Sequence, residues 1–507
     1  LGVGEFRIFG DGNRELTARE HGIPQFTGLP FTLQELTNGN GYDEMDTIQV
    51  GNHLSWIRGK HNLRFGGELY RATMERGAAN LEEGRLTFSA NESGYALASF
   101  LMGYPSNTQS PEGLPLTFPR SNRLGFYIQD DWKASSRLTI NAGLRFDYVG
   151  VPVDSQGLWR TLDLPGDGGG VEGRGQGYQT PDGRTIPTIF PTEVNENGAV
   201  KLFKQRVRFF MPRLGIAYRP WDKWVIRAGA GWFDNINHLN TWTIFNLMPP
   251  KSGSLDFNSV TDNARTISVP GADGGTYDIR TRMFRPGAPI LTLDDPFLTR
   301  SGAAANVRPV NLSSLPPDTF DGDVWKWSFD IQRELPFNTV VTVGYAGSKG
   351  THVGNSLSNF NQAPPSSNTN IQARRPYPEF FDPALPERGI QALGNIRYID
   401  SYGESFYHGL QAKLDKRYAR GITVGIAYTL SKAHGDGENG GQEGASFQDP
   451  RDRVGSRGRY RFDQRHNFVA HYVWELPGRN LPGVLKHIAG GWQTNGIVSL
   501  RSGFPFT

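Results

Sequence analysis

Two groups of side chains carry the residue types that acid–base or metal chemistry requires. Asp294 and Asp295 are adjacent carboxylates, and such a pair can share a proton or bind calcium. His434, Asp436 and Glu438 alternate with glycines, a spacing at which a loop can present ligands to a hard metal ion. The second group lacks the Asp-x-Asp-x-Asp-Gly order of a calcium-binding loop. We therefore expect structural or solvated roles for both groups, and no metal site.

Other motifs of catalysis are missing from the sequence. The glycine-rich run 166–170 is followed by no Lys-Ser or Lys-Thr pair, so it predicts a flexible loop and not a phosphate-binding one. No Gly-x-Ser-x-Gly elbow occurs with a matching order of Asp and His. The 507 residues include no cysteine, which excludes thiol nucleophiles, disulfide scaffolds, Cys-ligated zinc and iron–sulfur clusters. The sequence predicts neither an enzyme nor a bound cofactor.

Charge balance and hydropathy narrow the class of protein further. Lys and Arg total 53 against 50 Asp and Glu, and the net charge of +3 gives no electrostatic case for a nucleic-acid partner. No run approaches the roughly 18 consecutive apolar residues of a transmembrane helix. Crossing by strands stays possible, because transmembrane strands alternate apolar and polar residues and look polar on average.

Alternation with a period of two residues recurs in runs of about ten, which is the signal of strands with one apolar face. In residues 137–149 every even position is apolar, from Leu138 to Tyr148, whereas most odd positions are polar or charged. Comparable runs occupy residues 47–58, 62–75, 123–132, 207–219, 223–232, 325–332, 338–347, 404–416, 422–431, 464–475 and 490–501. Together the runs predict about twelve strands.

The connections between these runs alternate between short and long. Five short turns of three or four residues (59–62, 134–136, 220–222, 335–337 and 418–420) separate strands within hairpins, whereas segments of about 30 residues or more (76–120, 150–205, 235–322, 348–403 and 433–462) separate the hairpins. Short turns at one end and long loops at the other are typical of outer-membrane barrels. We predict an all-β, antiparallel up-and-down transmembrane β-barrel with long extracellular loops. A soluble sandwich or propeller also alternates, and it remains the competing interpretation.

The charged side of the alternation would face the lumen of such a barrel. Its members are Arg64, Glu68, Arg123, Asp131, Arg145, Asp147, Arg213, Arg227, Lys326, Asp330, Lys413, Asp415 and Arg465. They could hydrate the lumen and hold a plug domain, or pair with one another across neighbouring strands. Aromatic residues near the ends of the runs would form girdles at the two lipid interfaces, which makes outer-membrane lipid an expected partner. These residues are Trp56, Trp132, Tyr148, Trp224, Trp232, Tyr428, Trp474 and Trp492.

Aromatic residues in the long segments are candidate ligand contacts. Trp159, Tyr277, Tyr377, Phe380 and Phe381 could stack on a sugar or a peptide, or pack within the loops themselves. The mixed polar and aromatic composition of these segments suits a carbohydrate, a peptide or a metal chelate equally well.

Several motifs resemble one family of membrane proteins. Gln-Asp-Asp-Trp-Lys at 129–133, followed by the run 137–147, resembles the barrel signature of TonB-dependent receptors. Pro-Arg-Leu-Gly-Ile-Ala-Tyr at 212–218 is similar to the next hairpin of that family. The segments 344–350, 427–432 and 491–496 resemble the Oar-like subgroup, whose members often carry an N-terminal carboxypeptidase-regulatory-like domain.

The resemblance covers most of residues 46–507 and implies a barrel of about 22 strands. It also implies a separate N-terminal plug domain, the TonB complex as energy-coupling partner, and uptake of a bulky solute across the outer membrane of a Gram-negative bacterium. On this basis residues 46–507 would be an incomplete barrel domain and residues 1–45 a loop or partial-strand region, both internal portions of a longer protein. No plug or TonB-contacting segment is recognisable, so a passive porin or a surface adhesin remains the alternative.

Overall fold

The structure is a computed structural model, and most of the chain is described by it. The described residues are 25–30, 42–77, 84–90, 95–112, 116–167, 174–191, 194–195, 198–199, 208–236, 239–246, 248, 253–258, 267–268, 276–278, 283–284, 293, 309–319, 321–357, 359–436, 449–480, 483–484, 487–488 and 490–505.

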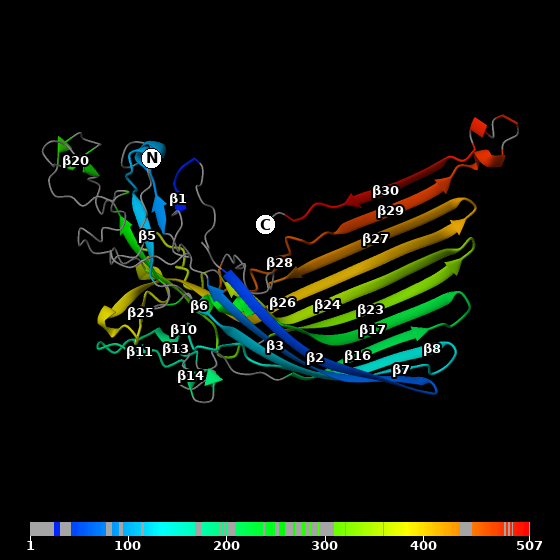
Figure 1. Cartoon of the computed structure of the whole chain (residues 1–507), viewed down its shortest axis with the longest axis horizontal. Coiled ribbons are helices and arrows are strands. Elements are labelled where there is room, and N and C mark those ends of the chain that lie inside the picture. Colours follow the sequence, from blue (N-terminus) through cyan, green and yellow to red (C-terminus); the bar gives the residue numbers. More distant parts are fainter. Residues whose placement is uncertain are drawn as a thin grey trace.

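Twelve long strands form a curved wall, and each pairs antiparallel with the next one along the chain (Figure 1). In order they are β2 (Tyr42–Arg58), β3 (His61–Gly77), β7 (Pro119–Trp132), β8 (Leu138–Val149), β16 (Arg208–Tyr218), β17 (Trp224–Asn235), β23 (Gly322–Leu335), β24 (Thr339–Leu357), β26 (Ile390–Ala419), β27 (Ile422–Gly435), β29 (His466–Glu475) and β30 (Gln493–Arg501). Each of the twelve predicted runs lies on one of these strands. The predicted antiparallel, all-β fold is therefore confirmed.

The wall strands are joined by tight turns at one end, except for the longer connection 476–492 between β29 and β30, and by long segments at the other end (Figure 1). Between β26 and β27 the turn consists of Arg420 and Gly421, both at positive φ (56° and 78°). Two positive φ values define the hairpin turn whose twist matches that of the flanking strands, and glycine adopts this conformation without steric cost. The first wall strand starts at Tyr42, four residues before the boundary expected at residue 46, because its pairing with β3 continues as far as Gly77.

The long segments build further small sheets beyond the wall (Figure 1). One sheet joins β1 (Gln25–Thr27), β4 (Arg85–Thr87), β5 (Asn107–Glu112) and β18 (Gly253–Asn258). Extensions of the main sheet are β6 (Leu116–Thr117), β9 (Val153–Asp154), β10 (Arg160–Asp163), β13 (Thr188–Pro191), β22 (Val310–Ser314), β25 (Glu379–Phe381) and β28 (Gly458–Arg459). Separate short pairs and triplets are β11 (Tyr178–Gln179) with β12 (Thr185–Ile186), β14 (Val194–Asn195) with β15 (Gly198–Ala199), and β19 (Ile267–Ser268), β20 (Thr276–Asp278) and β21 (Met283–Phe284).

Helical structure is sparse in the described part of the chain. The helical segments are α2 (Ala96–Leu101) and the 3-10 turns η1 (Leu239–Asn246), η2 (Gln372–Arg374), η3 (Pro386–Arg388) and η4 (Pro477–Asn480). Within the part of the chain that the structure describes, no helix is both long and apolar enough to cross a membrane.

Most buried hydrophobic residues lie in the long segments, and the others lie near the long-loop ends of wall strands. One core unites Leu162, Ile189, Leu312, Phe380 and Ile396 with their neighbours, which come from β10, β13, β22, β25 and β26. A second core contains Trp159, Trp242, Phe245, Leu315 and Ile399. The loops at this end therefore have an interior of their own, which we call the loop core. The wall itself is a single layer with two accessible faces.

Candidate functional site: a charged concave wall beneath packed loops

The charged positions of the wall lie on one face of the sheet. Residues directly opposite each other on paired strands share a face. Arg64 lies opposite Gln129, which lies opposite Gly143, which in turn lies opposite Arg213. When the register is followed from strand to strand, the other predicted lumen-facing residues within the strands lie on this same face. Arg465 directly precedes β29.

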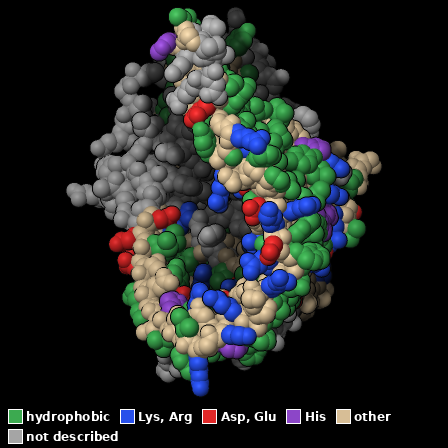
Figure 2. Space-filling model, turned by 90° about the vertical axis from the view of Figure 1, so that its right-hand side faces the viewer, with side chains coloured by type: hydrophobic (Ala, Val, Ile, Leu, Met, Phe, Trp, Pro, Cys, Tyr) green, Lys and Arg blue, Asp and Glu red, His purple; other side chains and the backbone are tan. Residues whose placement is uncertain are grey.

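The face that carries these charges is concave. Figure 2 looks at the molecule from the short-turn end, where Lys, Arg, Asp and Glu side chains gather around a central hollow and hydrophobic side chains lie on its outer flank. Arg64, Arg145 and Arg213 line a cavity of about 240 Å³, and Glu68 and Arg123 line a second cavity of similar volume.

Several of the concave charges are paired across or along the strands. Arg64 lies 2.8 Å from Asp131 on the neighbouring strand. Arg145 contacts both Glu68 and Asp147, with 2.6 Å between Arg145 Nε and Asp147 Oδ2. Cross-strand pairing, which the sequence left open, is therefore present. These pairs are accessible from the hollow, so each contributes about 1 kcal/mol or less to stability.

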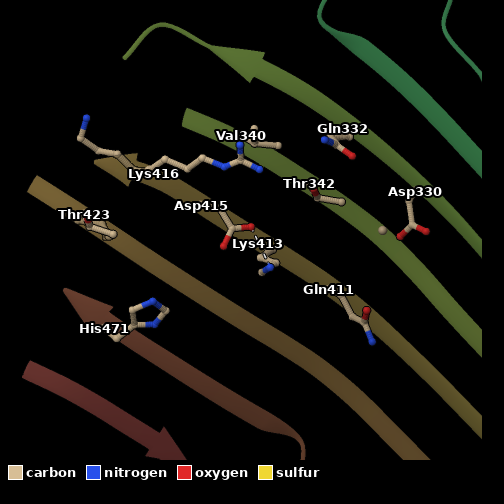
Figure 3. Close-up of a pocket in the computed structure, with 13 residues that line it drawn as sticks. Asp330, Gln332, Val340, Thr342, Gln411, Lys413, Asp415, Lys416, Thr423 and His471 are labelled. Atoms are coloured by element: carbon tan, nitrogen blue, oxygen red, sulfur yellow. Dashed lines mark ion pairs between the residues drawn. The ribbon is translucent and has the colours of Figure 1, made fainter. Parts of the chain in front are cut away.

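A larger cavity of about 590 Å³ opens on the concave face over β23, β24, β26, β27 and β29. Figure 3 shows Asp330, Thr342, Gln411, Lys413 and Asp415 along its lining, with Lys413 Nζ 2.9 Å from Asp415 Oδ2. Every one of these side chains can donate or accept a hydrogen bond. The cavity can therefore hold water or a polar chain segment, whereas an apolar group would leave its donors and acceptors unsatisfied.

The opposite face of the wall is apolar and exposed. It presents Leu54, Leu69, Phe126, Ile128, Leu144, Leu214, Phe329, Val343, Leu410, Val498 and Leu500, each between 40% and 62% exposed. The register makes these rows continuous, as where Ile128 lies opposite Leu144 and Leu410 opposite Tyr345. A soluble sandwich would bury such a face against a second sheet. Because this wall has a single layer, the competing soluble interpretation is wrong, and the apolar face suits lipid.

Most aromatic residues predicted for the two girdles lie on this apolar face near the strand ends. Trp56, Trp132, Trp224, Trp474 and Trp492 each lie within two residues of the short-turn end of a strand. At the long-loop end, Tyr148 lies one residue before the end of β8 and Trp232 three before the end of β17. Tyr428 lies in the middle of β27, and its hydroxyl reaches His466 Nδ1 at 2.8 Å.

The long-loop end of the apolar face also holds aromatic and histidine side chains for which the sequence predicted no role at the lipid interface. Trp325 stacks on Trp232 with 5.5 Å between ring centroids. Tyr345 hydrogen-bonds to His408 Nδ1 at 2.6 Å, and Phe406 stacks on His434 at 5.2 Å. The histidines could have been found from their period-two spacing with the aromatic residues of the same strands.

The candidate ligand-contacting aromatics divide into buried and accessible residues. Trp159 is 1% exposed and Phe380 is fully buried, so both pack in the loop core and neither can stack on a ligand. Tyr377 packs against the same core from its edge, and Phe381 stacks on Tyr178 with 4.0 Å between ring centroids. Local packing, which the sequence left open, accounts for Trp159 and Phe380, whereas Tyr377 and Phe381 are half-buried. The fifth candidate, Tyr277, lies in β20.

Buried ion pairs stabilise the loop core. Arg174 lies 3.3 Å from Asp163, and neither side chain is exposed to solvent. Arg160 binds Asp382 through two hydrogen bonds of 2.7 and 3.1 Å. Burial raises the pKa of Asp167, although the positive charge of Arg174 opposes the shift. These charges are internal to the loops.

Of the two groups with potential metal or acid–base chemistry, the structure describes only His434 and Asp436. His434 faces outward on β27 and stacks on Phe406. Asp436 instead accepts a hydrogen bond from the Glu404 backbone at 2.6 Å. Among the described residues no group of three or more His, Asp and Glu side chains is arranged to hold a metal ion. Asp294, Asp295, Glu438 and most of the 166–170 run lie outside the described residues.

A single-layered antiparallel wall with an apolar outer face and a charged concave face defines the class of outer-membrane β-barrels. The family model of the outer membrane beta barrel domain matches residues 5–507, and the chain belongs to that family. It accordingly lies in the outer membrane. None of the curated proteins matches the chain in sequence.

Several solved structures resemble the chain. The alcaligin outer membrane receptor FauA of Bordetella pertussis is 11% identical, with 91% of this chain and 47% of FauA covered and a TM-score of 0.35. The outer membrane transporter YddB of Escherichia coli is 10% identical, with 89% and 43% covered and a TM-score of 0.46. Pseudomonas aeruginosa FpvA bound to heterologous pyoverdines is 10% identical, with 91% and 38% covered and a TM-score of 0.37. The chain thus spans less than half of each of these proteins.

Proposed function

We propose that the chain contributes the wall of a TonB-dependent outer-membrane receptor of the Oar-like subgroup, which takes up a bulky solute such as a carbohydrate, a peptide or a chelate. In this proposal residues 46–507 belong to the barrel domain and residues 1–45 to a loop or partial-strand region. The observation that carries the proposal is the charged concave face. A wall of this character requires a polar filling, and a folded plug domain of the same protein can supply one.

Three cations of the concave face contact neutral side chains, although Asp330 lies opposite Arg227 in the register, and they support contact between the wall and a plug. Arg227 donates a hydrogen bond of 2.6 Å to the Gln332 side chain. Arg213 and Lys326 both lie over the ring of Phe233, at 4.4 and 5.6 Å from its centroid. Carboxylates on a plug would form stronger, charge-assisted bonds with these three side chains than their present partners do. We therefore propose them as plug contacts, with the TonB complex acting on the plug from the periplasm.

The long loops would capture the solute. Their packed core gives them a fixed shape, and their rim carries the accessible edges of Tyr377 and Phe381. We retain these two residues and Tyr277 as candidate ligand contacts. Trp159 and Phe380 would act indirectly, by holding the loops in place.

A passive porin or a surface adhesin remains the alternative, and conductance separates the candidates. The full-length protein from its natural gene is inserted into planar lipid bilayers, and its binding to the periplasmic domain of TonB is measured in parallel. A plugged transporter passes little current and binds TonB. Steady conductance without TonB binding would indicate a porin, and the absence of both would indicate an adhesin.

Variants of the wall test the plug contacts in the same bilayers. Replacing Arg227 and Lys326 together by Gln should raise the conductance, because the plug loses two charged contacts. Thr342→Gln is the matched control, since it adds a polar side chain to the same face without removing a charge. An unchanged conductance in the double variant would contradict the proposed plug contacts. The proposal of a transporter would then be decided by the measurement of TonB binding.

A further inference from the structure

The apolar face of β23, β24, β26 and β27 changes in composition toward the long-loop end. The register defines four successive rows across these strands. They are Ile331–Val343–Ala412–Tyr428, then Phe329–Tyr345–Leu410–Leu430, then Trp327–Gly347–His408–Lys432, and finally Trp325–Lys349–Phe406–His434. The first two rows contain aliphatic and aromatic residues alone, and the last two combine aromatic rings with histidines and lysines. The change marks the level at which lipid tails give way to headgroups.

The height of Lys349 agrees with this assignment. Lys349 follows Thr339, the first residue of β24, by ten residues (349 − 339). At about 3.4 Å per residue and a tilt of about 45°, ten residues rise by about 24 Å. The apolar band of an outer-membrane barrel is about 25 Å tall. Because long loops of such barrels are extracellular, the Lys349 ammonium lies at the headgroup level of the outer leaflet.

The cations of this region are arranged around one aromatic ring. Lys349 Nζ lies 5.4 Å from the centroid of the Phe406 ring, and the Arg457 guanidinium lies 6.0 Å from the same centroid. Both cations also contact Glu404, with 3.5 Å between Lys349 Nζ and its carboxylate. One carboxylate is thus shared by two cations, and a second, that of Asp436, lies 4.0 Å from Arg457 Nε. Lys432 on the neighbouring strand adds a third positive charge and is exposed.

The same height on another part of the wall has the opposite character. Arg71 follows His61, the first residue of β3, by ten residues (71 − 61) and is exposed on the outer face. Closer to the long-loop end, the same face carries Asp46 on β2, followed by Glu44 on β2 directly opposite Glu75 on β3. Acidic residues therefore outnumber the cation on β2 and β3. At this level the outer face of β2 and β3 is therefore acidic on balance, although Arg120 lies opposite Thr73 on the neighbouring β7.

We propose that Lys349, Lys432 and Arg457 form a binding site for the phosphate groups of an outer-leaflet lipid. Phosphate complements the net positive charge, and the lipid tails continue onto the apolar rows below. The rings of Phe406, His408 and His434 lie at the depth between the phosphates and the lipid tails, where aromatic side chains are favoured. The inference rests on the outer-membrane location of the barrel and is independent of the proposed transport.

Binding of lipid A to the purified protein in neutral detergent tests the site. Native mass spectrometry compares bisphosphorylated lipid A with its dephosphorylated form for the wild-type protein, for a K349Q/K432Q variant and for R71Q. Each Lys near an anionic lipid is worth about 1 kcal/mol, so the double variant should bind bisphosphorylated lipid A about 30-fold more weakly. R71Q, at matched height, should bind as the wild type does. The dephosphorylated lipid should bind all three proteins equally weakly.

Three results would overturn the proposal. They are equal wild-type affinity for the two forms of lipid A, unchanged affinity in the double variant, and an equal loss in R71Q. Inorganic phosphate added as a competitor should displace the lipid only partly. Full displacement at low concentration would assign the site to free phosphate instead. The comparison of the two lipids needs the wild-type protein alone, so the test is decisive even if the double variant fails to fold.

Discussion

Val343 and Thr342 offer a direct measurement of which face of the wall meets lipid. They are consecutive on β24, similar in size and shape, and directed to opposite faces. Val343 lies on the apolar face and is 46% exposed, whereas Thr342 lines the large polar cavity. Replacing each in turn by Arg places the same charge in two different media at nearly the same depth.

The magnitudes follow from the position of Val343 along β24. It lies four residues above Thr339 and six below Lys349, or about 10 Å and about 14 Å along the membrane normal. This is close to mid-membrane, where an Arg on the lipid face costs about 2–4 kcal/mol. Thr342→Arg enters an accessible polar cavity in which Asp330 and Asp415 attract the new charge and Lys413, Lys416 and Arg417 repel it. Its cost should stay within about 0.5 kcal/mol, as for most accessible positions.

Guanidinium unfolding in neutral phosphatidylcholine vesicles, followed by tryptophan emission, measures both costs. Val343→Ala is the control for lost apolar contact, so the difference between Val343→Arg and Val343→Ala isolates the charge. Equal and small costs for the two Arg variants, or a larger cost for Thr342→Arg, would refute the assignment of the faces.

Three further predictions concern the loop core, and limited proteolysis of the loops during denaturant titration measures each of them. Asp163→Asn leaves the Arg174 guanidinium buried without its carboxylate and should destabilise the loops by about 3–5 kcal/mol, whereas Asp182→Asn, in an exposed ion pair, should have no measurable effect. Trp159→Ala removes a fully buried ring and should cost about 3–5 kcal/mol, and a loss below about 1 kcal/mol would contradict the packing described for it. Because burial raises the pKa of Asp167 in the folded protein, the folded loops bind its proton more tightly than the unfolded chain does, so their stability should fall as the pH rises from about 4 through the raised pKa. Asp167→Asn should remove this part of the pH dependence, and an unchanged profile would exclude Asp167 as its source.

The wall strands could be predicted from the sequence because each strand has one face toward lipid and the other toward water. Lipid on one side and water on the other impose period-two alternation, which is a local property of the chain. The upper half of β26 shows where this signal ends. Residues 390–403 of β26 are largely buried on both faces within the loops, so their alternation is lost and the strand was predicted from residue 404 only.

The loop core was beyond prediction for a different reason. Leu162 and Phe380 belong to one cluster although 218 residues (380 − 162) separate them. The residues next to each side chain do not indicate that the two are in contact. Short strands such as β10 also contain too few residues to show the two-residue alternation of a strand. The aromatic candidates of the loops could therefore be located in sequence, but their burial depended on contacts that only the folded chain defines.

β26 has a mechanical consequence for the molecule. Its 30 residues run without a break from the loop core, where Ile396 and Tyr398 are buried, to the cavity lined by Lys413 and Asp415. A hydrogen-bonded strand resists stretching, so a displacement of its upper end is carried along its axis and not absorbed by a hinge. The loop core and the concave wall are therefore mechanically coupled through β26. A force applied to the loops should displace the residues that line the cavity.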